Sequence, residues 1–154
     1  MEKSTSQLDA VADQFSGLSV SSGYETLYRI VRPDENPEEG LVAKDPSAEK
    51  TVGSHVKFGA RAWYKSQFIS TTKSLEVAKH YKTRDEKRGF TGLRIVKIDL
   101  DALPNKCNLQ IVDLTIAENR EEHLGKAVCK NFANFSQEVL LTCDVPIPCY
   151  VITS

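Results

Sequence analysis

The 154-residue chain lacks the spacing patterns that mark common metal and phosphate sites. Its four cysteines stand at positions 107, 129, 143 and 149, and none forms a CxxC pair. Its three histidines stand at positions 55, 80 and 123 and make no HxxxH or HExxH motif. Because zinc sites need closely spaced ligands on at least one side, we expect no metal. A glycine-rich phosphate loop is also missing from the sequence.

Long apolar runs and an excess of charge are missing as well. No apolar run approaches the roughly 20 residues that a membrane-spanning helix needs. The first ten residues, MEKSTSQLDA, hold one lysine and no apolar stretch, unlike a secretory signal. The net charge of −1 gives no general attraction to nucleic acid or membrane. We therefore expect reduced thiols and an intracellular protein, cytoplasmic or nuclear, with no membrane partner.

What remains is the composition of one globular domain, with 40% apolar and 27% charged residues. Residues 1–22 are rich in serine and contain one stretch of apolar residues at helical spacing, between Leu8 and Leu18. This leader is either a short amphipathic helix capped by Ser6 or partly disordered. The domain itself then covers residues 23–154.

Strand-like segments dominate the rest of the chain. Residues 25–31 (ETLYRIV) are aromatic and β-branched and are ended by a proline, which predicts a strand. Further strands are predicted at residues 68–70, 93–100 and 109–114, with two more between 138 and 152 that form a hairpin-like ending. Residues 33–60 hold three prolines and three glycines and are predicted to be a long loop.

Two helices are predicted between these strands. The first begins at Thr72 or Ser74 as N-cap, with Leu75, Ala78 and Tyr81 as its apolar stripe. The charged residues 79–88 that follow are predicted to be a solvated loop. The second helix has its apolar residues at spacings of four, four and three, which places them on one face. These residues are Leu124, Val128, Phe132 and Phe135.

Three short motifs occur in a defined order along the chain. They are Leu27-Tyr28-Arg29, Phe68-Ile69-Ser70-Thr71-Thr72 with Ser-Leu-Glu-Val-Ala following, and Glu138-Val139-Leu140-Leu141. Each motif alone is weak, but the three together resemble the Arg-Ser-Glu class of ADP-ribosyltransferases over about residues 25–152. The resemblance implies an α+β fold of one domain, with a split, strand-rich core and inserted helices. It also implies NAD as substrate.

The resemblance assigns a role to each motif. Cleavage of the nicotinamide–ribose bond of NAD creates an oxocarbenium-like cation, which a carboxylate stabilises. By resemblance this carboxylate is Glu138, and Ser70 orients it. Arg29 is expected to bind the pyrophosphate, because its planar guanidinium makes bidentate contacts that lysine cannot make. Further contacts to NAD are implied for Tyr28, Ile30, Thr71 and Thr72.

The residue two positions before the glutamate bears on the acceptor. Arginine-modifying members carry Glu or Gln there, whereas this chain has Ser136, which the resemblance implies to be acceptor-facing. One hydroxyl cannot polarise a guanidinium as a carboxylate can. We therefore expect transfer of ADP-ribose to an acceptor other than arginine, in a protein or a nucleic acid, or hydrolysis of NAD.

Each of these residues also has a structural interpretation. Arg29 could be a surface or ion-paired residue, Ser70 to Thr72 could cap the following helix, and Glu138 could protect a sheet edge. The whole domain could be a catalytically silent protein-binding module. It could also bind nucleic acid through the basic residues 79–88. His55, in the predicted long loop, is expected to be solvated.

Overall fold

The computed structural model describes residues 26–61, 63–104 and 107–153. The helix expected between Leu8 and Leu18 lies outside these described residues. The described part is a mixed α/β fold with one sheet of six strands, in which every pair of neighbours is antiparallel. The strands are β1 (Tyr28–Val31), β2 (Ile69–Thr72), β3 (Arg94–Ile98), β4 (Gln110–Asp113), β5 (Glu138–Thr142) and β6 (Cys149–Thr153). No helix in these ranges is long and apolar enough to cross a membrane.

The sheet has the order β4-β5-β2-β1-β3-β6 and is weakest between β2 and β1. These two strands pair only through Tyr28 and Thr72, whereas β1 pairs with β3 along all its residues. This weak pairing divides the sheet into two halves, β4-β5-β2 and β1-β3-β6. Side chains from both halves form the larger core. Its main members are Leu27, Val31, Val96 and Ile98 from one half, and Ile69, Val139 and Leu141 from the other.

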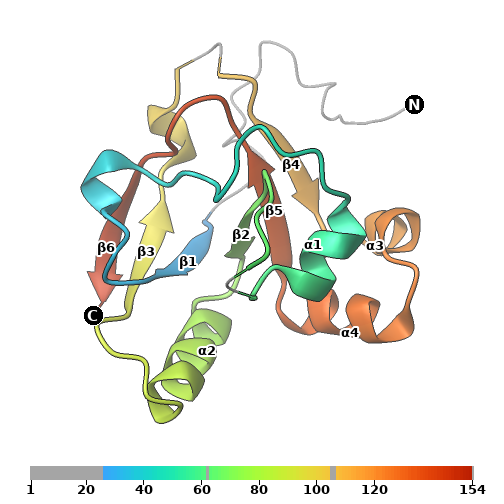
Figure 1. The fold of residues 1–154 in the computed structure, drawn as a ribbon, viewed down its shortest axis with the longest axis horizontal. Helices are drawn as coiled ribbons and strands as arrows, with labels where there is room; N and C mark the ends of the chain where they lie inside the picture. Colours follow the sequence, from blue (N-terminus) through green and yellow to red (C-terminus); the bar gives the residue numbers. More distant parts are fainter. Residues whose placement is uncertain (1–25, 62, 105–106, 154) are drawn as a thin grey trace.

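The described residues contain four α-helices, three gathered beside the half of the sheet that holds β4 and β5 and one below the middle strands in the view of Figure 1. They are α1 (Val52–Phe58), α2 (Leu75–Lys87), α3 (Ala117–His123) and α4 (Ala127–Phe135). Side chains of α1 and α4 pack on Leu140 of β5 and form a second core with Leu114 and Leu124. Because Val139 and Leu141 point to the first core and Leu140 to the second, β5 is buried on both faces.

The predicted hairpin-like ending is wrong. β5 pairs with β2 and β4, while β6 pairs with β3 at the far edge of the other half. The connection between β5 and β6 therefore crosses from one half of the sheet to the other. On its way Ile147 forms an isolated bridge with Leu41.

The predicted long loop at residues 33–60 also needs correction. It contains a short 3-10 turn (Pro37–Glu39) and helix α1. Thr51 caps α1, because its hydroxyl accepts the backbone N–H of Ser54 at 3.1 Å. The helix was hard to expect because its sequence, VGSHVKF, holds a glycine and two β-branched valines, which disfavour helix in isolation.

Helix α2 extends further than predicted. The sequence allowed Thr72 or Ser74 as its N-cap, and the structure shows Ser74, whose hydroxyl accepts the N–H of Val77 at 3.1 Å. The helix then continues to Lys87 through the charged residues that were expected to be a solvated loop. An ion pair of 2.7 Å between Lys82 and Glu86, one turn apart, stabilises this charged part as helix.

The helix predicted from Leu124 to Phe135 is α4, which begins only at Ala127, because Leu124 is the C-cap of α3. The predicted apolar face of α4 is turned outward. Of the four predicted stripe residues only Leu124 is buried. Val128, Phe132 and Phe135 remain 70%, 44% and 60% exposed. The side of α4 that packs into the second core carries the smaller Cys129 and Ala133.

Candidate functional site

The three motif residues come together where the sheet splits. β1 carries Arg29, β2 carries Ser70, and β5 begins with Glu138. In the register of β2 and β5, Thr72 lies opposite Glu138 and Ser70 lies opposite Leu140. Directly opposed residues of an antiparallel pair share a face, so Ser70, Thr72 and Glu138 point to the same side. The adjacency that the motif order implied is therefore present.

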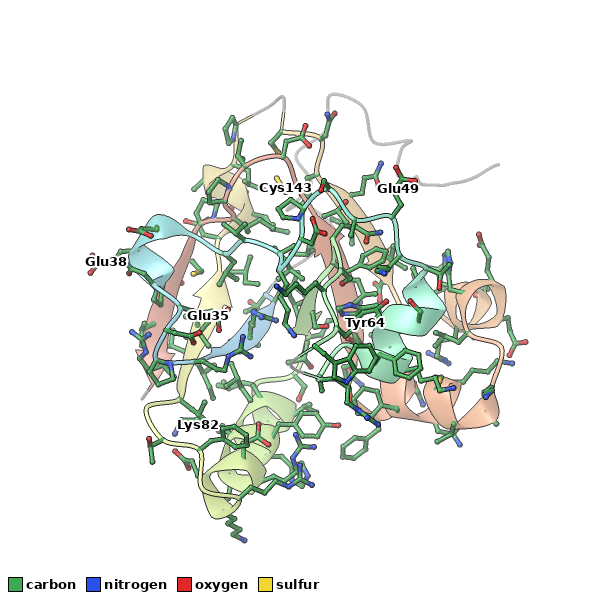
Figure 2. All side chains as sticks on the ribbon, in the orientation of Figure 1. Glu35, Glu38, Glu49, Tyr64, Lys82 and Cys143 are labelled. Atoms are coloured by element: carbon green, nitrogen blue, oxygen red, sulfur yellow. The ribbon has the colours of Figure 1, made fainter. Side chains whose placement is uncertain are left out.

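Arg29 spans the gap between the two half-sheets. Its Nη1 donates to the backbone carbonyl of Ser70 at 3.0 Å. Its Nη2 lies 3.5 Å from Oε2 of Glu35. Glu35 follows β1 in the chain and is labelled in Figure 2. The Nε of Arg29 is buried and has no hydrogen-bond partner. The guanidinium is thus held by two contacts, and its Nε remains without a partner.

Glu138 is a buried carboxyl, only 6% exposed. Burial raises its pKa to about 7, and the hydrogen bond from Ser70 and the charge of Arg29 oppose this rise. Its Oε1 has no hydrogen-bond partner. Near neutral pH both the protonated and the ionised form of Glu138 are therefore accessible.

His55 is a site residue that the sequence reasoning missed. Its Nε2 lies 2.7 Å from the hydroxyl of Ser70, and its Nδ1 lies 2.6 Å from the hydroxyl of Ser66. Burial lowers its pKa to about 4, assisted by the positive charges of Arg29 and Lys44, so the ring is neutral at pH 7. The signal that could have found it is the spacing of Val52, His55 and Val56, which places His55 on the apolar face of a helix.

The hydrogen bonds around His55 run in one direction. The backbone N–H of Phe68 donates to the Ser66 hydroxyl at 3.2 Å, which leaves that hydroxyl to donate to Nδ1 of His55. The Nε2–H of His55 then donates to Ser70, which leaves the Ser70 hydroxyl proton for Glu138, whose pKa Ser70 lowers. This assignment follows from the network, since the proton positions depend on the tautomer. A neutral histidine thus holds the Ser70 hydroxyl toward the carboxylate.

Two aromatic side chains and one lysine make contacts near α1, next to the site. The Phe68 ring packs edge-on against His55 at 5.5 Å. The hydroxyl of Tyr64, whose side chain is labelled in Figure 2, makes a short hydrogen bond with that of Ser54. The Nζ of Lys44 donates to three backbone carbonyls between residues 59 and 64, at 3.2 to 3.3 Å. These contacts fix the segment after α1 next to the site.

The remaining residues expected to contact NAD lie in different environments. Tyr28 and Ile30 flank Arg29 on β1 and are partly exposed. Thr72 faces the site side, where its hydroxyl donates to the Ser136 carbonyl at 2.6 Å and accepts the N–H of Ser74. Thr71 points to the opposite side of β2, is buried, and donates to the Val139 carbonyl at 2.7 Å. The expected contact between Thr71 and NAD therefore does not fit, because alternation along the strand turns its side chain away.

Ser136 also differs from the expectation that it faces the acceptor. Its side chain is buried, and its hydroxyl lies 2.8 Å from that of Tyr81. The exposed residue of this turn is Gln137, which adopts a left-handed backbone with φ of 51°. Ser136 therefore lies on the turn before Glu138, as expected, but its side chain points into the protein.

Candidate metal ligands do not gather in the described part of the chain, where no group of three or more His, Cys, Asp or Glu residues is placed to hold an ion.

Comparison with known proteins supports the fold and names a family. The chain is similar to the solved structure of EcPltA, with a TM-score of 0.53 at 17% identity, over 80% of this chain and 71% of that one. At this identity the likeness shows the fold alone. No curated protein matches the sequence. The family described as a domain of unknown function, DUF7587, matches residues 20–153, and the chain therefore belongs to that family.

Proposed function

We propose that the protein cleaves the nicotinamide–ribose bond of NAD and transfers the ADP-ribose to an acceptor other than arginine, or to water. The bond between the ribose carbon and the nicotinamide nitrogen breaks, and nicotinamide leaves with the electron pair. The acceptor then bonds to the same carbon and loses a proton. The juxtaposition of Arg29, Ser70 and Glu138 at the split of the sheet supports this proposal.

The observation that carries the proposal is a pair of unsatisfied buried atoms. Within the described ranges, the buried side-chain nitrogen and oxygen atoms without a hydrogen-bond partner are Nε of Arg29 and Oε1 of Glu138. Such atoms cost about 1–3 kcal/mol each when left unpaired, so their presence at a site calls for an explanation. A ligand that offers anionic oxygens and hydroxyl groups would satisfy both. NAD has these groups in its pyrophosphate and its ribose.

Each residue has a defined task in this chemistry. Ionised Glu138 would stabilise the positive charge that develops on the ribose, and its buried position strengthens that interaction. Ser70, held by neutral His55, orients the carboxylate. Arg29 would bind the pyrophosphate, which must compete with Glu35 for Nη2.

The acceptor is inferred from what surrounds Glu138. The turn before it offers the exposed amide of Gln137 and the buried hydroxyl of Ser136. Neither carries the negative charge that would attract and polarise a guanidinium. This favours an acceptor other than arginine.

A catalytically silent protein-binding module is the second candidate, and the exposed apolar residues of α4 favour it. Binding of nucleic acid through residues 79–88 has less support. Three of the five basic side chains of this segment form ion pairs on α2, namely Lys79 with Glu76, Lys82 with Glu86 and Arg84 with Asp85. These pairs reduce the charge left for phosphate contacts.

Incubation of the purified chain with NAD tests the proposal. Chromatography would measure released nicotinamide, and mass spectrometry would detect ADP-ribose on added proteins and nucleic acids. We expect nicotinamide release. Binding of NAD without release would instead establish the silent module, and the absence of both would refute the assignment of the site.

A further inference from the structure

The apolar face of α4 is exposed although the helix is amphipathic. Val128, Phe132 and Phe135 lie at i, i+4 and i+7, which aligns them on one side of the helix. Helices on a globular domain normally bury such a stripe. Here Cys129 and Ala133 are the residues of α4 that pack into the second core. The larger side chains are thus left for something outside the described fold to cover.

The stripe continues onto α2, which lies next to α4 (Figure 1). Phe132 stacks on Tyr81 with ring centroids 6.3 Å apart and an interplanar angle of 29°. Phe135 packs edge-on against Tyr81 at 6.4 Å and His80 at 6.1 Å. We call the five side chains His80, Tyr81, Val128, Phe132 and Phe135 the aromatic face. Rings fixed against one another offer a large apolar surface with little entropy to lose on binding.

The aromatic face is connected to the candidate site. The Tyr81 hydroxyl lies 2.8 Å from that of Ser136, and the Ser136 carbonyl accepts the hydroxyl of Thr72. Ser136 ends α4 and stands two residues before Glu138. A molecule docked on the aromatic face would therefore lie beside the turn that leads to Glu138.

The two chain segments that carry the aromatic face have a net positive charge. Residues 75–88 hold five basic and three acidic side chains, a net charge of +2. Residues 124–137 hold two lysines, Lys126 and Lys130, and no acidic residue, although the ion pair of Lys130 with Glu121 of α3 at 2.9 Å offsets one of these charges. The whole chain has a net charge of −1, so these two segments stand out from the rest. A complementary partner would surround its own apolar surface with carboxylates.

We infer that the aromatic face docks a protein whose apolar surface is ringed by acidic side chains. That the docked partner also accepts the ADP-ribose in the reaction at Glu138 rests on the proposed function. A protein fits better than a nucleic acid because the Tyr81 ring is already covered by Phe132 and by Arg84, whose guanidinium carbon lies 4.5 Å from the ring centroid. In addition, Val128 has no ring on which a base could stack.

The probe for this surface is an amphipathic helical peptide of about 16 residues, with leucine and phenylalanine at i, i+3, i+4 and i+7 and glutamate elsewhere. A second peptide keeps the apolar stripe and replaces each glutamate by lysine. Fluorescence anisotropy with the intact chain would measure both affinities. We expect the glutamate peptide to bind at least about tenfold more tightly than the lysine peptide.

The double variant Phe132→Ser/Phe135→Ser should lose at least about tenfold in affinity for the glutamate peptide. The matched control is Tyr150→Ser, because Tyr150 is a similarly exposed aromatic residue on β6 at the far edge of the sheet. Its affinity should equal that of the unmodified chain. Circular dichroism would confirm that all three proteins are folded.

Three results would overturn the inference. The first is equal affinity for the two peptides, or affinity unchanged in Phe132→Ser/Phe135→Ser. The second is binding of a polyuridine oligonucleotide that this double variant abolishes, which would assign the face to nucleic acid. The third is a concentration-dependent dimer that the double variant dissociates, which would assign it to a second copy of the chain. Peptide binding needs no NAD, so a failure here leaves nicotinamide release unaffected, and the reverse also holds.

Discussion

The buried carboxyl of Glu138 should make folding stability depend on pH in a way that Glu138→Gln removes. The pKa of Glu138 rises from 4.5 to about 7 through burial, so the folded chain holds this proton more tightly than the unfolded chain. Between pH 4.5 and 7 the free energy of unfolding therefore falls as the pH rises. The difference of about 2.5 in pKa, at 1.36 kcal/mol for each pH unit, corresponds to about 3 kcal/mol.

Comparison of wild type with Glu138→Gln isolates this contribution from other titrating groups. At pH 4.5 the carboxyl of wild type is largely protonated and resembles the amide. At pH 8 the carboxylate is ionised and buried, so the variant should be the more stable protein by about 3 kcal/mol more than at pH 4.5. For a chain of this length that equals a shift of about 6–12 °C in melting temperature.

His55 should produce the opposite slope. Its pKa falls from 6.5 to about 4 through burial, so the unfolded chain binds its proton more tightly and stability rises with pH between 4 and 6.5. The two contributions nearly cancel in wild type over this range. In Glu138→Gln the free energy of unfolding should therefore rise with pH over this range, and in His55→Gln it should fall.

Urea denaturation at pH 4.5, 6 and 8 would measure these differences. The exposed Glu76 of α2 provides the control Glu76→Gln, which makes the same chemical change at a side chain that is 86% exposed. A difference between wild type and Glu138→Gln that stays constant from pH 4.5 to 8 would refute the reasoning, because it would mean that Glu138 is solvated.

Three further outcomes are expected. Arg29→Lys should weaken NAD binding about tenfold in calorimetry, because lysine cannot make the bidentate phosphate contact, and equal affinities would return Arg29 to a structural role. Polyarginine should not be labelled by wild type, and Ser136→Glu should lower stability without creating arginine labelling, because the new carboxylate would be buried. Efficient labelling of polyarginine would contradict this. Ser74→Ala should cost about 1 kcal/mol in urea denaturation through loss of the α2 N-cap, and an unchanged midpoint would show that the cap is dispensable.

The strands that carry the site were predictable from sequence because their signals are local. Runs of β-branched and aromatic residues around Arg29, Ser70 and Glu138 mark strands, and the order of the motifs implied that they are neighbours. Strand pairing that depends on distant residues was not predictable. β6 lies beside β3 because side chains such as Ile147 fill the core between the half-sheets, and no local pattern near the C-terminus encodes that partner.

Helix α4 shows a second limit of periodicity. The spacing of its apolar residues locates a stripe but does not say which way the stripe faces. In the fold, the small side chains of Cys129 and Ala133 let the helix backbone approach Leu140, and the large residues point outward. His55 was missed for a related reason, since three prolines and three glycines around it suggested a loop and hid one short capped helix.

The rate of nicotinamide release from NAD by wild type and Glu138→Gln tests the central claim most directly. Gln keeps the size of the side chain and removes the charge that would stabilise the cation, so we predict a decrease of about 10²–10³ in rate. NAD affinity should be retained, and Glu76→Gln should release nicotinamide at the wild-type rate. Full turnover by Glu138→Gln would contradict the account.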